Sequence, residues 1–227
     1  MSQITNEVKN QIKKRRTFAI ISHPDAGKTT LTEKFLLYGG AINQAGSVKG
    51  KATAKHAVSD WMEIEKERGI SVTSSVLQFN YDGYCINILD TPGYFDFVGE
   101  VEEAVSAADA AVIVVSGKAG VEVGTEKAWE LCDKYKLPRM VYVTEMDVDD
   151  ASFRQVVQDL TDRYGKVIAP HFQPIRENEK LVGYVNVIKN AARRYTGVGQ
   201  REECEIPEYC KPNLEIYRDK LLELSLI

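Results

Sequence analysis

A loop that can bind phosphate lies near the start of the sequence. Residues 22–29, SHPDAGKT, keep the spacing of the pattern GxxxxGK[ST], with Ser22 in place of the first glycine. In that pattern Gly27 lets backbone N–H groups approach the phosphates, Lys28 places an ammonium group against their terminal oxygens, and Thr29 offers a hydroxyl to Mg²⁺. The residues of this loop that we expect to bind a nucleotide are His23, Pro24, Asp25, Ala26, Gly27, Lys28, Thr29 and Thr30.

A second group of polar residues follows the apolar run 84–90. Asp90 ends this run, and its carboxylate suits a Mg²⁺ ion held through water. Gly93, three residues later, fits a backbone N–H that faces the terminal phosphate. Ser71 follows a long polar segment and offers a further hydroxyl for Mg²⁺, although the sequence alone fits a strand-edge serine equally well. Residues 40–71 and 90–105 are therefore candidate switch segments that respond to the terminal phosphate.

Tyr94 stands where a hydrolase would position its attacking water. A phenol can hydrogen-bond water, but a pKa near ~10 makes it a poor general base at neutral pH. Phosphoryl transfer depends mainly on positioning and charge stabilisation, so Lys28, Gly93 and Tyr94 are the candidate catalytic residues. The alternatives are a slow hydrolase, a nucleotide-gated binding module with little or no hydrolysis, and an ATPase or kinase. Tyr94 and Phe95 could also simply pack against the sheet.

A mostly parallel sheet is needed to bring these residues together. Apolar strands alternate with helices along the chain, which predicts an α/β fold with helices on both faces of the sheet. Ligands of such sheets bind at the carboxyl ends of the strands. The expected strands are 17–22, a hairpin from 72 to 90 around the Asp82-Gly83 turn, 110–116 and 139–144; the expected helices are 28–38, 98–107, 124–135 and 149–164.

Three segments are predicted. Residues 1–16 read as a helix that ends in the basic run 13–16, either a solvated helix end or a contact with RNA phosphates. Residues 17–164 form the phosphate-binding core. Residues 165–227 read as an inserted subdomain with a β-hairpin turning near 177–180, a loop, and the beginning of a helix.

Composition narrows the class of protein. The 227 residues are 44% hydrophobic and 27% charged, which is ordinary for a globular domain. The net charge of −4 gives no global basic field, so we expect no sequence-specific nucleic-acid binding by the chain alone. The four cysteines form no CxxC pair, which argues against a zinc site. Without a membrane span or an apolar leader stretch, the expectation is a cytoplasmic monomer.

Together these motifs resemble the ribosome-associated translational GTPases. Residues 15–93, including SHPDAGKTT, SDWMEIEKERGIS and LDTPG, are most similar to bacterial peptide chain release factor 3. Residues 94–220 are similar to elongation factor G and its elongation-factor-G-like paralogues. The resemblance implies a Ras-like G domain, GTP or GDP with Mg²⁺, and the ribosome as partner. It also implies that Thr29 and Ser71 bind Mg²⁺ with Asp90 in the outer shell.

The sequence departs from this family's pattern at three places. Tyr94 replaces a histidine that is usual in the family, and Thr144-Glu145-Met146-Asp147 replaces Asn-Lys-x-Asp. The resemblance implies that Thr144, Glu145 and Asp147 face the guanine base. Asp147 can still accept two hydrogen bonds from guanine, whereas Glu145 cannot place a cation over it; a polar turn without a ligand is the alternative. No Ser-Ala motif follows the insert, so we expect the last strand and helix of a G domain to be absent.

Overall fold

The computed structural model describes residues 5–43, 71–178 and 180–225. The chain divides into two compact units, which are described separately. The first contains residues up to Val115 together with Glu122–Tyr142, and the second contains Ser116–Val121 together with the chain from Val143 onward. The predicted domain boundaries remain a prediction.

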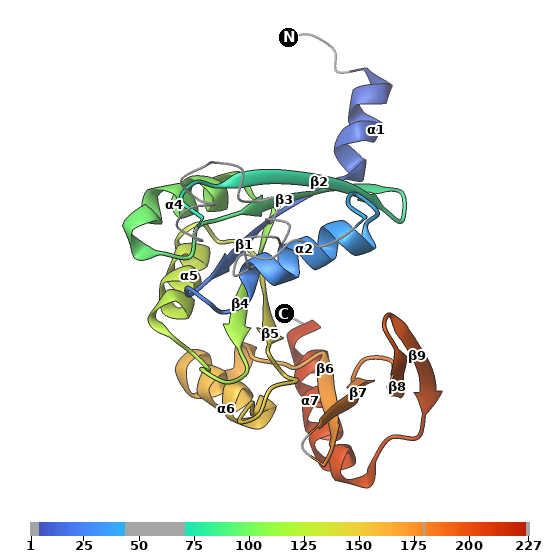
Figure 1. The fold of residues 1–227 in the computed structure, drawn as a ribbon. Helices are drawn as coiled ribbons and strands as arrows, with labels where there is room; N and C mark the ends of the chain where they lie inside the picture. Colours follow the sequence, from blue (N-terminus) through green and yellow to red (C-terminus); the bar gives the residue numbers. More distant parts are fainter. Residues whose placement is uncertain (1–4, 44–70, 179, 226–227) are drawn as a thin grey trace, which may run out of the picture. The chain divides into compact units, whose positions relative to one another are not determined.

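A five-stranded, mostly parallel sheet confirms the predicted fold class (Figure 1). Its strand order is β2-β3-β1-β4-β5, and β1 pairs in parallel with both β3 and β4. The edge strand β2 is antiparallel to β3, and the turn between them has positive φ at Asp82 (48°) and Gly83 (78°). This turn was predicted from the Asp-Gly pair. The strands are β1 Arg15–Ser22, β2 Ser75–Tyr81, β3 Tyr84–Asp90, β4 Ala110–Ser116 and β5 Arg139–Thr144.

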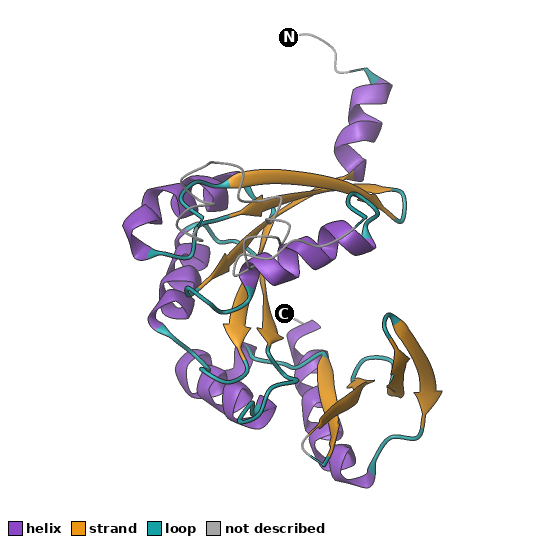
Figure 2. Ribbon diagram, in the orientation of Figure 1, coloured by secondary structure: helices purple, strands orange, loops and turns teal. Residues whose placement is uncertain are grey.

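Helices pack on both faces of this sheet, with α2 on one side and α4 and α5 together on the other (Figures 1 and 2). The central strands are buried because both of their faces are covered, as their continuous apolar runs predict. Ile20, Ile88 and Val114 are each 0% exposed and share a core cluster with Leu31 of α2. The elements are α2 Lys28–Tyr38, the 3₁₀ turn η1 Phe95–Phe97, α4 Val98–Ala107 and α5 Val123–Lys134.

The first strand begins earlier than the sequence suggested. Helix α1 spans Asn6–Lys14 and buries no residue, and β1 starts at Arg15 rather than at residue 17. Arg15 and Arg16 pair with Cys85 and Ile86 of β3, so strand pairing takes these two arginines out of the expected helix. The Arg16 guanidinium also lies 4.6 Å from the centre of the Tyr84 ring. The basic run is therefore shared between a helix end and a strand.

The second unit contains a four-stranded antiparallel sheet in the order β6-β7-β8-β9. Only the β6–β7 hairpin was predicted. The second pair, β8 and β9, was missed because its strands carry several charged residues and turn at Gly199 (φ +71°). Apolar residues of β6, β7 and α7 form its core, against which Phe153 and Val157 of α6 pack. The elements are α6 Phe153–Tyr164, η2 Gly165–Val167, β6 Phe172–Glu177, β7 Lys180–Asn186, β8 Ala191–Gly197, β9 Gln200–Cys204, η3 Glu208–Cys210 and α7 Lys211–Ser225.

None of the described helices combines the length and the apolar character needed to cross a membrane.

Candidate functional site

The candidate phosphate loop connects the end of β1 to the start of α2. Its turn needs two left-handed residues, Asp25 (φ 62°) and Gly27 (φ 83°), and Gly27 is the N-cap of α2. The free backbone N–H groups at a helix start attract anions. Lys28 opens the helix with a side chain that is only 6% exposed. Thr29 is half-buried, whereas Asp25 and Thr30 are exposed.

The Lys28 ammonium group donates a hydrogen bond to the Asp90 carboxylate at 2.8 Å. Asp90 ends β3, which lies beside β1, so its position in the sheet brings it to the loop. Its side chain is 1% exposed, and the same oxygen accepts a hydrogen bond from the Thr32 hydroxyl at 3.2 Å. Lys28 and Asp90 were predicted as separate phosphate and metal ligands, and the structure brings them together as a buried ion pair.

Thr32 was missed by the sequence reasoning, although one signal was present. It lies four residues after Lys28 in α2, so both side chains occupy the same helix face. A hydroxyl one turn after the loop lysine is therefore in reach of any carboxylate that the lysine meets.

The turn after Asp90 is fixed to the first strand. Thr91 donates through its hydroxyl to the Ile20 carbonyl oxygen at 2.7 Å. A β-carbon on Gly93 would lie 3.4 Å from the Pro24 α-carbon, so the Gly93 backbone lies against the phosphate loop. This is the neighbourhood that a backbone N–H needs if it is to face a terminal phosphate.

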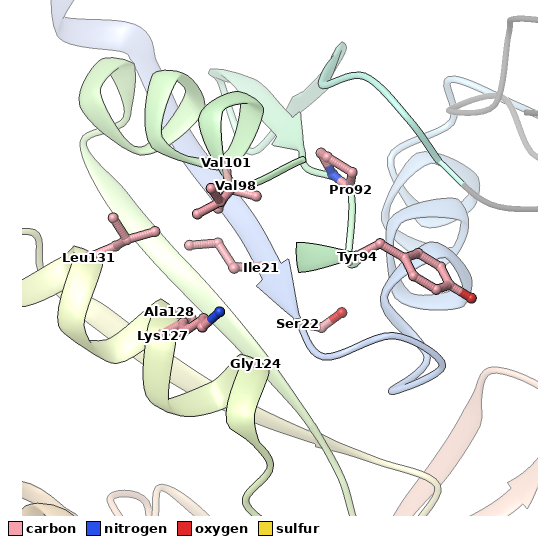
Figure 3. Close-up of a pocket in the computed structure, with 11 residues that line it drawn as sticks. Ile21, Ser22, Pro92, Tyr94, Val98, Val101, Gly124, Lys127, Ala128 and Leu131 are labelled. Atoms are coloured by element: carbon pink, nitrogen blue, oxygen red, sulfur yellow. The ribbon is translucent and has the colours of Figure 1, made fainter. Parts of the chain in front are cut away.

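Tyr94 borders a small pocket between η1–α4 and α5, but its ring points away from the pocket (Figure 3). Tyr94 is 38% exposed, so the residue is not buried against the sheet. The pocket is mostly apolar, and its largest apolar side chains are Ile21, Val98, Val101 and Leu131. The side chain of Phe95 lies outside the described residues.

His23 faces the start of α5 rather than the loop interior. Its Nε2 atom lies 3.3 Å from the Glu122 carboxylate, and Glu122 is the N-cap of α5, in a capping box with Thr125. A β-carbon on Gly124 would lie 2.6 Å from the His23 α-carbon, so the two backbones touch. No sequence pattern could have joined these two distant segments.

Ser71 is half-buried, and the segment that follows it is tied to α4. The Ser74 backbone N–H donates to the Glu100 carboxylate at 2.8 Å, and the Ser74 hydroxyl donates to the Glu100 carbonyl oxygen at 3.0 Å. Ser74, three residues after the first predicted switch segment, is therefore hydrogen-bonded to the second one. Most of the first one, residues 44–70, lies outside the described residues.

The candidate base-recognition residues lie in the second unit, at the end of β5. Glu145 has a left-handed backbone (φ 54°), and its carboxylate accepts the Ser116 hydroxyl hydrogen at 2.5 Å. The Gly117 backbone N–H donates to the Thr144 carbonyl oxygen at 2.9 Å, and Asp147 is exposed. Ser116 was missed, although it ends an apolar strand in the same way as Asp90.

The predicted metal ligands Thr29, Ser71 and Asp90 present hydroxyl and carboxylate oxygens, which are the donors that Mg²⁺ prefers. Within the described ranges, no group of three or more His, Cys, Asp or Glu side chains could hold a metal ion by itself. These donors fit a Mg²⁺ ion that takes its remaining ligands from water and a nucleotide phosphate. Their assignment to the metal remains a prediction.

Comparison with known proteins gives a consistent result. Residues 13–219 match the family described as elongation factor Tu GTP binding domain. The chain is 44% identical over 201 residues to a peptide chain release factor 3 from Aromatoleum aromaticum, covering 88% of this chain and 37% of that protein. A crystal structure of a protein from Thermus thermophilus superposes with a TM-score of 0.83 at 36% identity, covering 92% of this chain and 30% of the other. The chain thus spans about a third of the length of these relatives.

Proposed function

The chain belongs to the elongation factor Tu GTP-binding domain family, and from this premise we propose that it binds GTP with Mg²⁺ and hydrolyses it slowly. The buried Lys28–Asp90 pair at the phosphate loop is the observation that carries the proposal. It places the lysine of a phosphate-binding pattern and the acid of a phosphate-sensing turn within 2.8 Å of each other. When nucleotide binds, a phosphate would take the place of Asp90 beside Lys28, and the hydrated metal ion would take the place of Lys28 beside Asp90.

The proposed reaction begins with an exchange of partners. Lys28 leaves Asp90 and turns its ammonium group to the phosphate oxygens, where it neutralises negative charge. Thr29 and Ser71 would hold Mg²⁺ through their hydroxyl oxygens, and the freed Asp90 carboxylate would hold it through water. When bound, Mg²⁺ would neutralise negative charge on the phosphates. The Gly93 N–H faces the terminal phosphate from its place beside the phosphate loop.

Slow hydrolysis is proposed because of Tyr94. Its exposed ring carries a hydroxyl that can donate to or accept from an attacking water, but it is a weak base at neutral pH. The presence of Tyr94 and of Glu145 at these positions also favours a second candidate, a nucleotide-gated binding module with little hydrolysis. A response of residues 90–105 to GTP would then reach Ser74 through its hydrogen bonds with Glu100, without turnover of the nucleotide.

Guanine selectivity is proposed for Thr144, Glu145 and Asp147. The Asp147 carboxylate is exposed and can accept hydrogen bonds from the guanine N1–H and 2-amino groups. Each such bond to a charged acceptor contributes about 1.5–3 kcal/mol. Adenine offers neither donor in that arrangement, so Asp147 discriminates against ATP.

The ribosome is the proposed partner, because the chain is similar to a protein named peptide chain release factor 3. This proposal concerns the whole protein, since the chain covers 37% of that relative. Cytoplasmic location is proposed on the same basis.

A titration and a turnover assay test the proposal. The chain should bind GTP and GDP with Mg²⁺ at least about tenfold more tightly than ATP, a difference of about 1.4 kcal/mol. Equal affinity for GTP and ATP would end the guanine assignment. In the turnover assay, Tyr94→His should raise the hydrolysis rate above that of the unmodified chain. Hydrolysis that stays at background with ribosomes present, for the full-length protein, would leave the binding module as the better description.

A further inference from the structure

We propose that Ser116 and Gly117 are positioning residues for the candidate base-recognition loop, residues 144–147, and that Ser116 and Glu145 form a matched pair. The inference rests on the proposed guanine binding and deepens it. It states how this chain holds the loop although a glutamate replaces the usual lysine. All of the contacts involved lie within the second unit.

The other hydrogen bonds of Ser116 mean that its hydroxyl can act only as a donor toward Glu145. Its hydroxyl oxygen accepts the backbone N–H of Lys118 at 3.2 Å and that of Ala119 at 3.1 Å. A serine hydroxyl has two acceptor sites and one hydrogen. Because both acceptor sites are occupied, the remaining hydrogen goes to the Glu145 carboxylate at 2.5 Å. Ser116 is 4% exposed, so water does not compete for these bonds.

This arrangement requires an acceptor at position 145. A lysine there has only donors to offer, and the Ser116 oxygen has no acceptor site left for them. The glutamate is therefore the side chain that fits this serine. The departure from Asn-Lys-x-Asp at Glu145 is matched by the residue that ends β4.

Gly117 holds the backbone of the same loop. Its N–H donates to the Thr144 carbonyl oxygen at 2.9 Å, and its carbonyl oxygen accepts the Ser152 backbone N–H at 3.0 Å. A β-carbon on Gly117 would lie 2.8 Å from the Thr144 carbonyl oxygen and 2.8 Å from the Met146 sulfur. Met146 could move, but the carbonyl group belongs to the backbone. Any side chain larger than glycine would push the loop away.

Ser116 and Gly117 thus contact three consecutive loop residues, Thr144, Glu145 and Met146. The next residue is Asp147, whose carboxylate has to be aimed at the guanine edge. Fixing three residues before Asp147 reduces the conformational freedom that a ligand would otherwise have to restrict. Ser116 and Gly117 therefore act on base selectivity by holding the loop, without contacting the base.

The test compares the affinities of the 227-residue chain for GDP and for inosine diphosphate, which lacks the 2-amino group. Ser116→Ala and Glu145→Leu should each lower the preference for GDP about tenfold, the size expected for one lost hydrogen bond to a charged group, or about 1.4 kcal/mol. Gly117→Ala should lower it at least as much. Glu145→Gln keeps an acceptor oxygen for the Ser116 hydroxyl and should lower the preference less than Glu145→Leu does, whereas Glu145→Lys should lose it.

The controls separate positioning from folding. Gly197→Ala is the matched control for Gly117→Ala, since its β-carbon would meet only the flexible Gln200 side chain, at 3.4 Å. Circular dichroism melts identify a variant that fails to fold. Glu145 is exposed, so the pair Glu145→Gln and Glu145→Leu remains decisive if Ser116→Ala unfolds.

Three outcomes overturn the inference. A folded Ser116→Ala variant with unchanged preference shows that the serine does not position the loop. A loss of preference in Glu145→Gln equal to that in Glu145→Leu shows that Glu145 acts as a charge on the ligand. If the unmodified chain binds ADP as tightly as GDP, both the proposed guanine binding and this inference are overturned. The first two outcomes overturn the inference alone, so the two failures can be told apart.

Discussion

Replacing Asp90 with asparagine should destabilise the chain when no nucleotide is bound. The substitution removes the charge that faces Lys28 while keeping an oxygen that can accept from the Thr32 hydroxyl. The Lys28 and Asp90 side chains are 6% and 1% exposed, so the ammonium group would be left buried without a counter-charge. Removal of one partner from a buried pair costs about 3–5 kcal/mol, and the retained hydrogen bond favours the lower end.

A loss of about 3 kcal/mol corresponds to a fall of about 6–12 °C in the melting midpoint of a chain of this length. The fluorescence of Trp129 in α5, which lies 4.3 Å from the Arg139 guanidinium, provides a signal from the first unit. Glu102→Gln is the control, because it breaks an exposed pair with Lys134 and should leave the midpoint nearly unchanged. The double variant Lys28→Met, Asp90→Leu should recover stability relative to Asp90→Asn, since no buried charge remains.

The result that refutes this reasoning is an Asp90→Asn midpoint equal to that of the unmodified chain. Lys28 would then be held by something other than this carboxylate. A second measurement tests the proposed exchange of partners: Asp90→Asn should make GTP affinity less dependent on Mg²⁺, because the carboxylate is the proposed outer-shell partner of the metal. An unchanged Mg²⁺ dependence would show that Asp90 does not hold the metal ion, and it would not contradict the Lys28–Asp90 ion pair.

Three further predictions concern residues around this pair. Thr32→Val should cost about 1–2 kcal/mol in urea unfolding, since it removes a buried hydrogen bond to a charged oxygen; no cost would show that the bond is not formed. Gly124→Ala should weaken GDP binding about tenfold in a titration, because its β-carbon would displace the His23 backbone, whereas Gly197→Ala should leave binding unchanged. Burial raises the pKa of the Cys132 thiol, so its contribution to stability is complete below the ordinary thiol pKa of ~8.5 and is lost as the pH rises toward the folded value. Cys132→Ala should therefore flatten the fall in melting midpoint above that pH, and equal slopes would contradict the assignment.

The sheet could be read from the sequence because its signals are local. Residues 110–116 and 139–144 were predicted as strands with the boundaries that the structure has, since each is a short apolar or β-branched run between turn signals. The Asp82-Gly83 turn required only two adjacent residues. The second sheet was half missed because β8 and β9 carry exposed charges, including Arg193 and Glu203, which give no apolar alternation.

Contacts between candidate residues were harder to predict than the residues themselves. The phosphate-loop pattern describes the groups around a nucleotide and says nothing of their contacts with one another. The Lys28 ammonium group pairs with the Asp90 carboxylate because β3 lies beside β1 in the sheet, and this neighbourhood is not encoded in the loop pattern. The pairing of His23 with Glu122 depends on how the loop packs against α5, and no spacing in the sequence encodes it.

Polar residues at the ends of apolar strands have a common use in this fold. Ser22 begins the phosphate loop, Asp90 binds Lys28, Ser116 binds Glu145, and Thr144 accepts from Gly117 through its carbonyl group. Ser22, Asp90 and Ser116 each end a strand whose neighbouring residues are buried in the core, so burial fixes the strand and thereby the position of its polar end. The carboxyl ends of parallel strands are where α/β sheets bind ligands. A polar residue that closes an apolar run should be weighed as closely as a named motif, because on this criterion Ser116 was as visible in the sequence as Asp90.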